Sequence, residues 1–144
     1  MKILVPIDVS KYSMEGVKAA SEYAKTKDAE IHLITVTPFV PGLDLEISAR
    51  AMDSLNKSMK KRAEDTLDQA QKILGKAGVA AKTTIASSIS AADEIIGVAE
   101  KEKTDLIIIG SRGLGGKATR FFMGSVASKV VNHAPCSVLV VRTG

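Results

Sequence analysis

Leu106-Ile107-Ile108-Ile109, a short apolar run, leads directly into the loop Gly110-Ser111-Arg112-Gly113-Leu114-Gly115-Gly116-Lys117, and Gly124-Ser125 follows at a distance. A buried strand that leads into a glycine-rich loop and then a helix is an arrangement that binds phosphate. Glycines let backbone N–H groups converge, and the helix N-terminus adds the positive end of its dipole. The stretch therefore predicts a parallel-type strand, a phosphate-binding loop and a nucleotide ligand.

Neither of two common phosphate motifs fits this loop. Counted back from Gly116-Lys117, a Walker A motif would need a glycine where Ser111 stands and a hydroxyl side chain where Ala118 stands. The spacing Gly113-x-Gly115-x-x-Ala118 matches a dinucleotide fingerprint, but it follows the fourth predicted strand, and no acidic residue comes about 20 residues later. We interpret that match as accidental.

Length and composition predict one soluble domain, residues 1–144. The chain has 144 residues, 45% hydrophobic and 25% charged, which is enough to bury a core. No apolar run approaches the roughly 18 residues of a membrane helix, and Met1-Lys2 leads into a short strand, not into a secretory leader. With Cys136 as the lone cysteine, no internal disulfide forms, and we expect a reducing, cytoplasmic location without membrane partners.

The net charge of +4 does not by itself indicate nucleic-acid binding. A basic cluster over 57–62 is interleaved with the acidic residues Glu64, Asp65 and Asp68, as on a solvated helix face. Aromatic residues make up 3% of the chain, which leaves little for base stacking. We expect no nucleic-acid partner. A metal site is also not expected, because His32 and His133 lack further ligands at suitable spacing.

Strand and helix patterns alternate along the chain. Helical spacing of apolar residues predicts four helices, the second ended by Gly78 and the third begun by a Ser90 capping box. The expected strands are Lys2 to Ile7, Ile31 to Val36, Ala81 to Ala86, Leu106 to Ile109 and Val138 to Val141, and the expected helices are Ser13 to Lys25, about Asp44 to Ala77, Ser90 onward, and Ser125 to before Pro135.

This alternation predicts an α/β fold, with a five-stranded parallel sheet covered by helices on both faces. Such sheets bind ligands beyond the carboxyl ends of their strands, where the strand order reverses. Asp8 after the first strand and the glycine loop after the fourth both lie at such ends. The two features share one crevice if those strands are neighbours, which the residues alone do not establish.

Three segments give the chain a resemblance to the universal stress protein family: Met1 to Ser10, Gly110 through Ala127, and His133 to Val141. The resemblance covers nearly the whole chain. It implies a Rossmann-like, adenine-nucleotide alpha-hydrolase-like three-layer sandwich with strand order 3-2-1-4-5, which makes the first and fourth strands neighbours. It also implies an ATP motif, Gly-x2-Gly-x9-Gly-Ser/Thr. This chain has ten residues between Gly113 and Gly124, one more than the motif.

The resemblance implies the site residues one by one. Asp8 and Val36 would lie beside the adenosine, with Pro6 and Ile7 shaping the wall. The remaining residues would follow the loop and surround the phosphates: Ile109, Gly110, Arg112, Gly113, Gly124, Ser125, Val126 and Ala127. Each has a simpler alternative, such as a helix cap or turn for Asp8, a helix cap for Ser125 and a surface cation for Arg112.

We therefore expect an ATP-binding regulatory module of the stress response, with ADP or AMP as other ligands and Mg²⁺ or Mn²⁺ carried on the phosphates. Any ATP hydrolysis is expected to be slow, because Asp8 alone is not a catalytic constellation. Two alternatives stay open: a nucleotide-free interaction module of the same family and a weak phosphohydrolase. The apolar C-terminal strand, Ser137 to Arg142, is expected to be an edge that pairs with a second copy, and a further protein partner is expected but not identified.

Overall fold

The computed structural model describes residues 1–10, 12–26, 28–38, 49–112 and 123–142. Their strands form one five-stranded sheet in the order β3-β2-β1-β4-β5, and all neighbouring strands are parallel. The expected fold class and strand order are confirmed. The elements in chain order are β1 (Lys2–Ile7), α1 (Ser13–Thr26), β2 (Glu30–Pro38), α2 (Ala49–Lys76), β3 (Ala81–Ser88), α3 (Ala91–Glu102), β4 (Leu106–Gly110), α4 (Ser125–His133) and β5 (Ser137–Val141).

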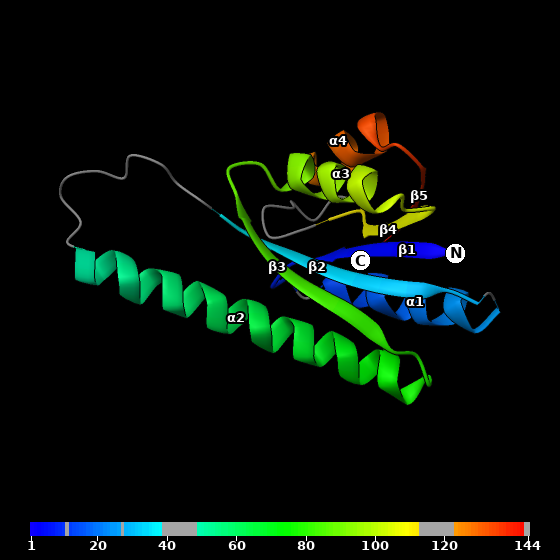
Figure 1. The fold of residues 1–144 in the computed structure, drawn as a ribbon, viewed down its shortest axis with the longest axis horizontal. Coiled ribbons are helices and arrows are strands. Elements are labelled where there is room, and N and C mark those ends of the chain that lie inside the picture. Colours follow the sequence, from blue (N-terminus) through cyan, green and yellow to red (C-terminus); the bar gives the residue numbers. More distant parts are fainter. Residues whose placement is uncertain (11, 27, 39–48, 113–122, 143–144) are drawn as a thin grey trace.

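Helices cover both faces of the sheet. Helices α1 and α2 pack on one face, and α3 and α4 pack on the other (Figure 1). The side chains of β1 alternate between these layers, as the two-residue repeat of a strand requires. Ile3, Val5 and Ile7 join the core under α1 and α2, whereas Leu4 joins the core under α3 and α4. Each fully buried aliphatic side chain contributes about 1.5–3 kcal/mol to folding.

Sequence signals at helix ends correspond to observed conformations. Gly78 follows α2 with a φ of 74°, which is the left-handed region that favours glycine. Ser90 is the N-cap of α3, and its Oγ accepts a hydrogen bond from the Asp93 N–H at 3.2 Å. Both expected helix boundaries are confirmed.

Helix α2 differs from its expected packing. Apolar residues at helical spacing on this segment favour one buried stripe along the whole helix, namely Leu55, Met59, Ala63, Leu67, Ala70 and Leu74. The buried residues of α2 are all in its second half, namely Ala63, Leu67, Ala70 and Leu74, and Leu55 is 45% exposed. The first half extends past the sheet in Figure 1, so there is no strand beneath it to cover its apolar side. The expected start near Asp44 lies outside the described residues.

The sheet opens at its carboxyl edge between β1 and β4. These strands pair at Ile3 and Leu4, with Leu106 and Ile107 of β4, and the pairing ends there although both strands continue. Pro6 lies beyond that pairing, so its missing N–H removes no hydrogen bond to β4. Strand β2 also runs past β1, because the last pair between them is Ile7 with Thr35. The strand ends thus surround a crevice where the strand order reverses.

Candidate functional site

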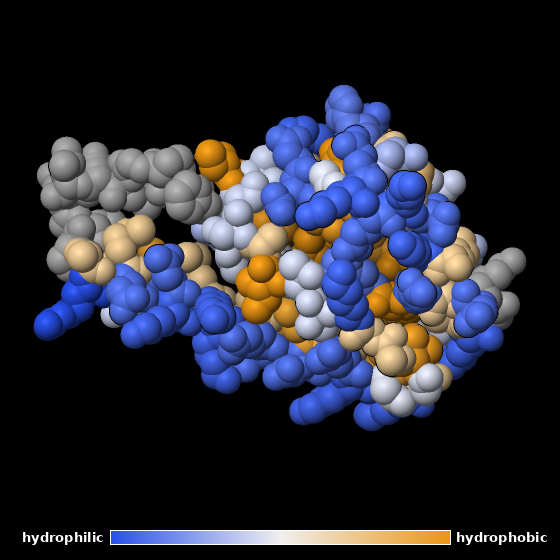
Figure 2. Space-filling model, in the orientation of Figure 1, coloured by the Kyte–Doolittle hydropathy of each residue, from blue (hydrophilic) through white to orange (hydrophobic). Residues whose placement is uncertain are grey.

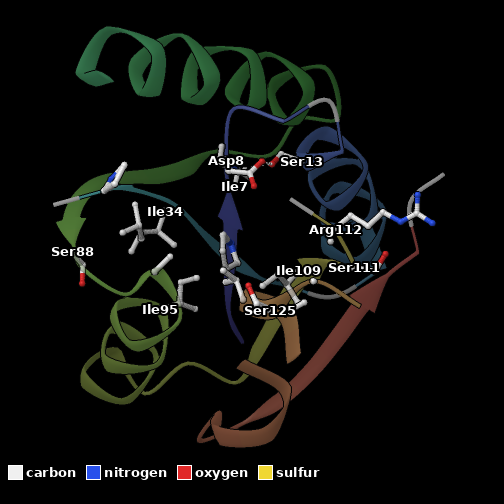
Figure 3. A pocket seen from close by; sticks show the side chains of 18 of the residues that line it. Ile7, Asp8, Ser13, Ile34, Ser88, Ile95, Ile109, Ser111, Arg112 and Ser125 are labelled. Carbon is white, nitrogen blue, oxygen red and sulfur yellow. Dashed lines mark hydrogen bonds between the residues drawn. The ribbon is translucent and has the colours of Figure 1, made fainter. Parts of the chain in front are cut away.

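A cavity of about 410 Å³ occupies this crevice (Figure 3). Its size falls within the range of small-molecule sites. The ends of β1, β2 and β4, the turn from β3 to α3, and the start of α4 all contribute to it. Its lining residues are Pro6, Ile7, Asp8, Ser13, Ile34, Val36, Pro38, Ser88, Ile89, Ala91, Ile95, Ile109, Gly110, Ser111, Arg112, Gly124, Ser125, Val126 and Ala127.

The structure brings together the residues that the resemblance implied. Every one of them except Gly113 lines the cavity, and Gly113 lies outside the described residues. The loop residue Lys117 lies outside them as well. The described residues among them therefore share a single concave surface. Their roles in binding stay predictions.

Asp8 is held in place by the start of α1. Its Oδ1 accepts hydrogen bonds from the Ser10 N–H at 2.8 Å and from the Ser13 hydroxyl at 2.7 Å. The Asp8 N–H in turn donates to Ser13 Oγ at 2.7 Å. Within the described chain, Oδ2 has no hydrogen-bond partner and keeps its capacity to accept (Figure 3). Asp8 thus stabilises the turn before α1, as the simpler alternative for it proposed. Its second carboxylate oxygen is still available as an acceptor.

The N-terminus of α4 is prepared for an anion. Its N-cap is Gly124, which makes no side-chain capping bond. The sequence offered Ser125 as a possible cap, but Ser125 is the first residue of the helix, one position too late for that role. The first N–H groups of a helix have no hydrogen-bond partner within the helix. In α4 the N-cap Gly124 has no side chain that could accept from them. The described part of this helix end therefore offers backbone donors and a positive dipole end to the cavity.

The two described ends of the glycine loop lie side by side. The Ser111 N–H donates to the Val141 carbonyl at 2.9 Å, and the Gly124 N–H donates to the Ser111 carbonyl at 2.7 Å. These bonds hold Gly110 and Gly124 at the same side of the cavity, and residues 113–122 of the loop lie outside the described chain. The loop's two described ends are thus fixed to β5 and to each other.

Arg112 is directed toward Tyr12, the residue before α1. Its guanidinium carbon lies 5.9 Å from the centre of the Tyr12 ring, within cation–π range. In Figure 3 its side chain runs away from the middle of the cavity. An anion contact by Arg112 would require the guanidinium to leave this ring. Arg112 is half-buried and lines the cavity, and its role in anion binding stays a prediction.

The cavity has a polar end and an apolar end. Asp8, Ser13, Ser111 and Ser125 lie toward the start of α1 and α4. The β2, β3 and α3 side is lined mainly by apolar residues, Ile34, Val36, Pro38, Ile89, Ala91 and Ile95, with Ser88 as its polar member. Ile34 and Ile95 are buried and form its floor. A ligand with an anionic end and a flat apolar end matches this division.

The sequence missed the contribution of the turn from β3 to α3. Ser88, Ile89 and Ala91 of this turn line the cavity, as does Ser13. The signal was present, because Ser88 ends a parallel strand and the carboxyl ends of parallel strands share one edge. The role of Ser13 was harder to find, since its pairing with Asp8 depends on how the turn folds.

The described residues contain neither a metal-binding cluster nor a membrane-spanning helix. No group of three or more His, Cys, Asp or Glu side chains there is arranged to hold a metal ion. No described helix combines the length and apolar character needed to cross a bilayer. Partial burial raises the pKa of the Cys136 thiol, which disfavours the reactive thiolate and fits its position at the edge of the core under α3 and α4.

Comparison with known proteins identifies the family. The model of the universal stress protein family matches residues 1–142. A universal stress protein of Methanocaldococcus jannaschii is 38% identical, over 98% of this chain and 81% of that protein. Among solved structures, UspA from Lactobacillus plantarum superposes with a TM-score of 0.87 at 27% identity, over 99% of this chain and 97% of that one.

More distant structures share the fold. One is a universal stress family protein from Arabidopsis thaliana with AMP bound, at a TM-score of 0.73 and 20% identity over 100% of this chain and 92% of that one. Others of the same fold are complexes with cAMP and with dAMP, both at 22% identity. At these identities the likeness concerns the fold, whereas the family match and the relative above concern the sequence. The chain belongs to the universal stress protein family.

Proposed function

We propose that the cavity binds an adenine nucleotide, with ATP as the main ligand and ADP or AMP as alternatives, and that the protein is a nucleotide-dependent regulatory module of the stress response. The observation that carries the proposal is the juxtaposition, in one cavity, of the α4 N-terminus, the Asp8 oxygen that accepts no hydrogen bond from the described residues, and an apolar end. These three features correspond to the phosphate, the ribose and the base.

The phosphate end is the α4 N-terminus. Backbone N–H groups of the first helical turn have no side-chain cap, and they point into a cavity that also contains the glycine-rich strand end. Phosphate binds well at such a position because N–H donors and the helix dipole act together. The described lining includes Asp8 as its one carboxylate. A Mg²⁺ or Mn²⁺ ion that accompanies ATP would therefore be held mainly by the phosphates themselves.

The ribose position is set by Asp8. A carboxylate oxygen accepts hydrogen bonds from ribose hydroxyls, and Oδ2 is the oxygen left for them. Preorganisation by Ser10 and Ser13 lowers the entropy lost when the ligand binds. A single fixed carboxylate binds a sugar well, but it supplies no partner acid or base for turnover. Any hydrolysis of ATP is accordingly slow, and the protein acts chiefly by binding.

Calorimetric titration of the purified chain tests this function. AMP, ADP and ATP should each bind with one ligand per chain, and tighter binding of ATP would support its place as the main ligand. Inorganic phosphate should compete only weakly, because it makes no base or ribose contact. Failure of all three nucleotides to bind would contradict the proposal and would favour a nucleotide-free interaction module.

A homodimer through β5 is also part of the proposal. Strand β5 is at the edge of the sheet and pairs with β4 on one side. Leu139 on this strand is 40% exposed, and an exposed apolar edge strand is suited to pairing with another strand. Leu139→Lys should convert the dimer to a monomer in analytical ultracentrifugation. An unchanged mass would count against this interface. The cytoplasmic location and a separate protein partner belong to the same proposal.

A further inference from the structure

Ile89 is unusually exposed for its size. Its side chain is 75% exposed, whereas the other exposed large hydrophobic residues of the described chain are between 37% and 45% exposed. Figure 2 shows an isolated apolar group of atoms where Figure 1 places the turn from β3 to α3. Exposure of an isoleucine to water is unfavourable, and single exposed side chains are common on protein surfaces. The position of Ile89, however, is at the edge of the cavity, which it lines.

The turn that carries Ile89 is fixed by its own hydrogen bonds. Ser88 Oγ accepts from the Ser90 N–H at 3.2 Å and donates to the Ser90 carbonyl at 3.1 Å. Ser90 then caps α3 through the Asp93 N–H, and its carbonyl accepts from the Glu94 N–H at 3.1 Å. The backbone on both sides of Ile89 is thus anchored, so this side chain is presented at a defined place.

The cavity side that carries Ile89 is mainly apolar, and the hydroxyl of its polar member, Ser88, is bonded to the Ser90 backbone. On the same side of the cavity lie Ile34, Val36 and Ile95, and no described side chain that lines this side carries a charge. Buried Ile34 and Ile95 form the floor, and Ile89 stands above them at the solvent edge. A flat aromatic ring that enters between floor and edge would remove the exposed surface of Ile89 from water.

We propose that Ile89 is the outer wall of the base-binding half of the cavity and sets the affinity for the nucleobase, but not for the ribose phosphate. The inference rests on the proposed nucleotide function and assigns to it a residue outside the phosphate and ribose positions. Because Ile89 is mostly exposed without ligand, its truncation removes little from the folded state. The effect of Ile89→Ala should therefore fall on binding and not on stability.

The test measures two ligands on two matched variants. The ligands are AMP and ribose 5-phosphate. The binding of ribose 5-phosphate is measured by its displacement of labelled ATP. The variants are Ile89→Ala and Leu55→Ala, since Leu55 is also an exposed apolar residue but is not among the cavity's lining residues. Ile89→Ala should weaken AMP about ten-fold and leave ribose 5-phosphate unchanged. Leu55→Ala should change neither, and both variants should keep the unfolding midpoint of the unmodified chain.

A tryptophan reporter gives an independent readout. The chain contains no tryptophan, so Ile89→Trp introduces a single emitting residue at the proposed wall. Addition of AMP should change its emission, and ribose 5-phosphate should not. Equal AMP affinity in Ile89→Ala and the unmodified chain, or equal loss for both ligands, would overturn the role of Ile89 while the nucleotide function stands. No binding of AMP to the unmodified chain would overturn both, and a changed sedimentation mass with unchanged AMP affinity would assign Ile89 to a protein interface instead.

Discussion

The two ends of the sheet differ in how far their polar and apolar groups are satisfied within the protein. At the amino end, the Lys2 N–H donates to Asp105 Oδ2 at 2.7 Å, and buried His32 bonds Glu102 and Thr84 at 2.7 Å each. At the carboxyl end, the α4 N-terminus has no side-chain cap and Ile89 is largely exposed. Groups that are satisfied internally stabilise the fold, whereas groups left open are available to a ligand. Stability and binding are therefore expected to depend on different ends of the same sheet.

The largest expected effect comes from a bulky side chain placed at the N-terminus of α4, at the carboxyl end of the sheet. Gly124→Val should weaken ATP binding by about 100-fold, because a branched side chain would occupy the space that the phosphate needs. The fold should persist, since Gly124 has a φ of −58° that any residue adopts. Calorimetry measures the affinity. Gly97→Val is the matched control, because a Cβ at Gly97 meets no heavy atom within 4 Å, and ATP affinity equal in the two variants would contradict the assignment.

The next effect belongs to the amino end and to stability. His32→Ala should lower the free energy of unfolding by about 2 kcal/mol, because it removes two hydrogen bonds and leaves a partly buried carboxylate with fewer partners. Nucleotide affinity should not change. Urea denaturation measures the stability, and His133→Ala, on an exposed residue of α4, is the control. A loss of affinity in His32→Ala at full stability would show that the two ends are coupled.

A smaller effect is expected at the ribose position. Asp8→Asn keeps an oxygen that can accept from Ser10 and Ser13 but replaces the free oxygen by an amide donor. AMP affinity should fall about ten-fold. A ligand without ribose hydroxyls, 2′,3′-dideoxyadenosine monophosphate, should bind both forms equally. If Asp8→Asn weakens both ligands to the same extent, Asp8 acts through the turn and not through the ribose.

The smallest effect is a pH dependence at Glu102. Partial burial raises the pKa of this carboxyl, but hydrogen bonds from Lys82 and His32, together with their charges, outweigh burial and lower it. The folded state therefore holds the proton less tightly than the unfolded chain. The resulting stabilisation is present above the unfolded pKa of about 4.3 and is lost as the pH falls through the lower folded pKa.

Comparison of the unmodified chain with Glu102→Gln checks this sign. The difference in the free energy of unfolding between them should be largest above about pH 5 and should shrink as the pH falls below about 4. Urea titrations at successive pH values measure it. A difference that stays constant through this range, or grows on acidification, would contradict the ion-pair account of the amino end.

Much of the fold could be predicted from local patterns. The strands and helices follow from short apolar runs, from the Ser90 cap and from the glycine after α2, because these signals act through neighbouring residues. The adjacency of β1 and β4 did not follow from the residues, since strand order depends on packing between distant segments, and it came from the family resemblance. The exposed first half of α2 was missed for a related reason, as its apolar repeat does not show where the sheet ends.

The candidate site was predicted in part. Asp8 and the glycine loop were both expected at the carboxyl ends of parallel strands, and the family resemblance made those strands neighbours. The N-cap of α4 is Gly124 and not Ser125, because Ser125 already has the helical backbone conformation of the first residue of α4. The direction of Arg112 toward Tyr12 and the place of Ile89 at the apolar end of the cavity depend on tertiary geometry. Neither could be found from spacing along the chain.

The central claim is that the carboxyl end of the sheet holds an adenine nucleotide, and the most direct measurement is the identification of bound nucleotide in the purified protein. Freshly purified protein is denatured, and released nucleotide is identified by chromatography and mass spectrometry, for the unmodified chain and for Gly124→Val. The account predicts ATP or ADP near one equivalent per chain in the first and its loss in the second. An empty unmodified chain that also fails to bind added ATP would contradict it.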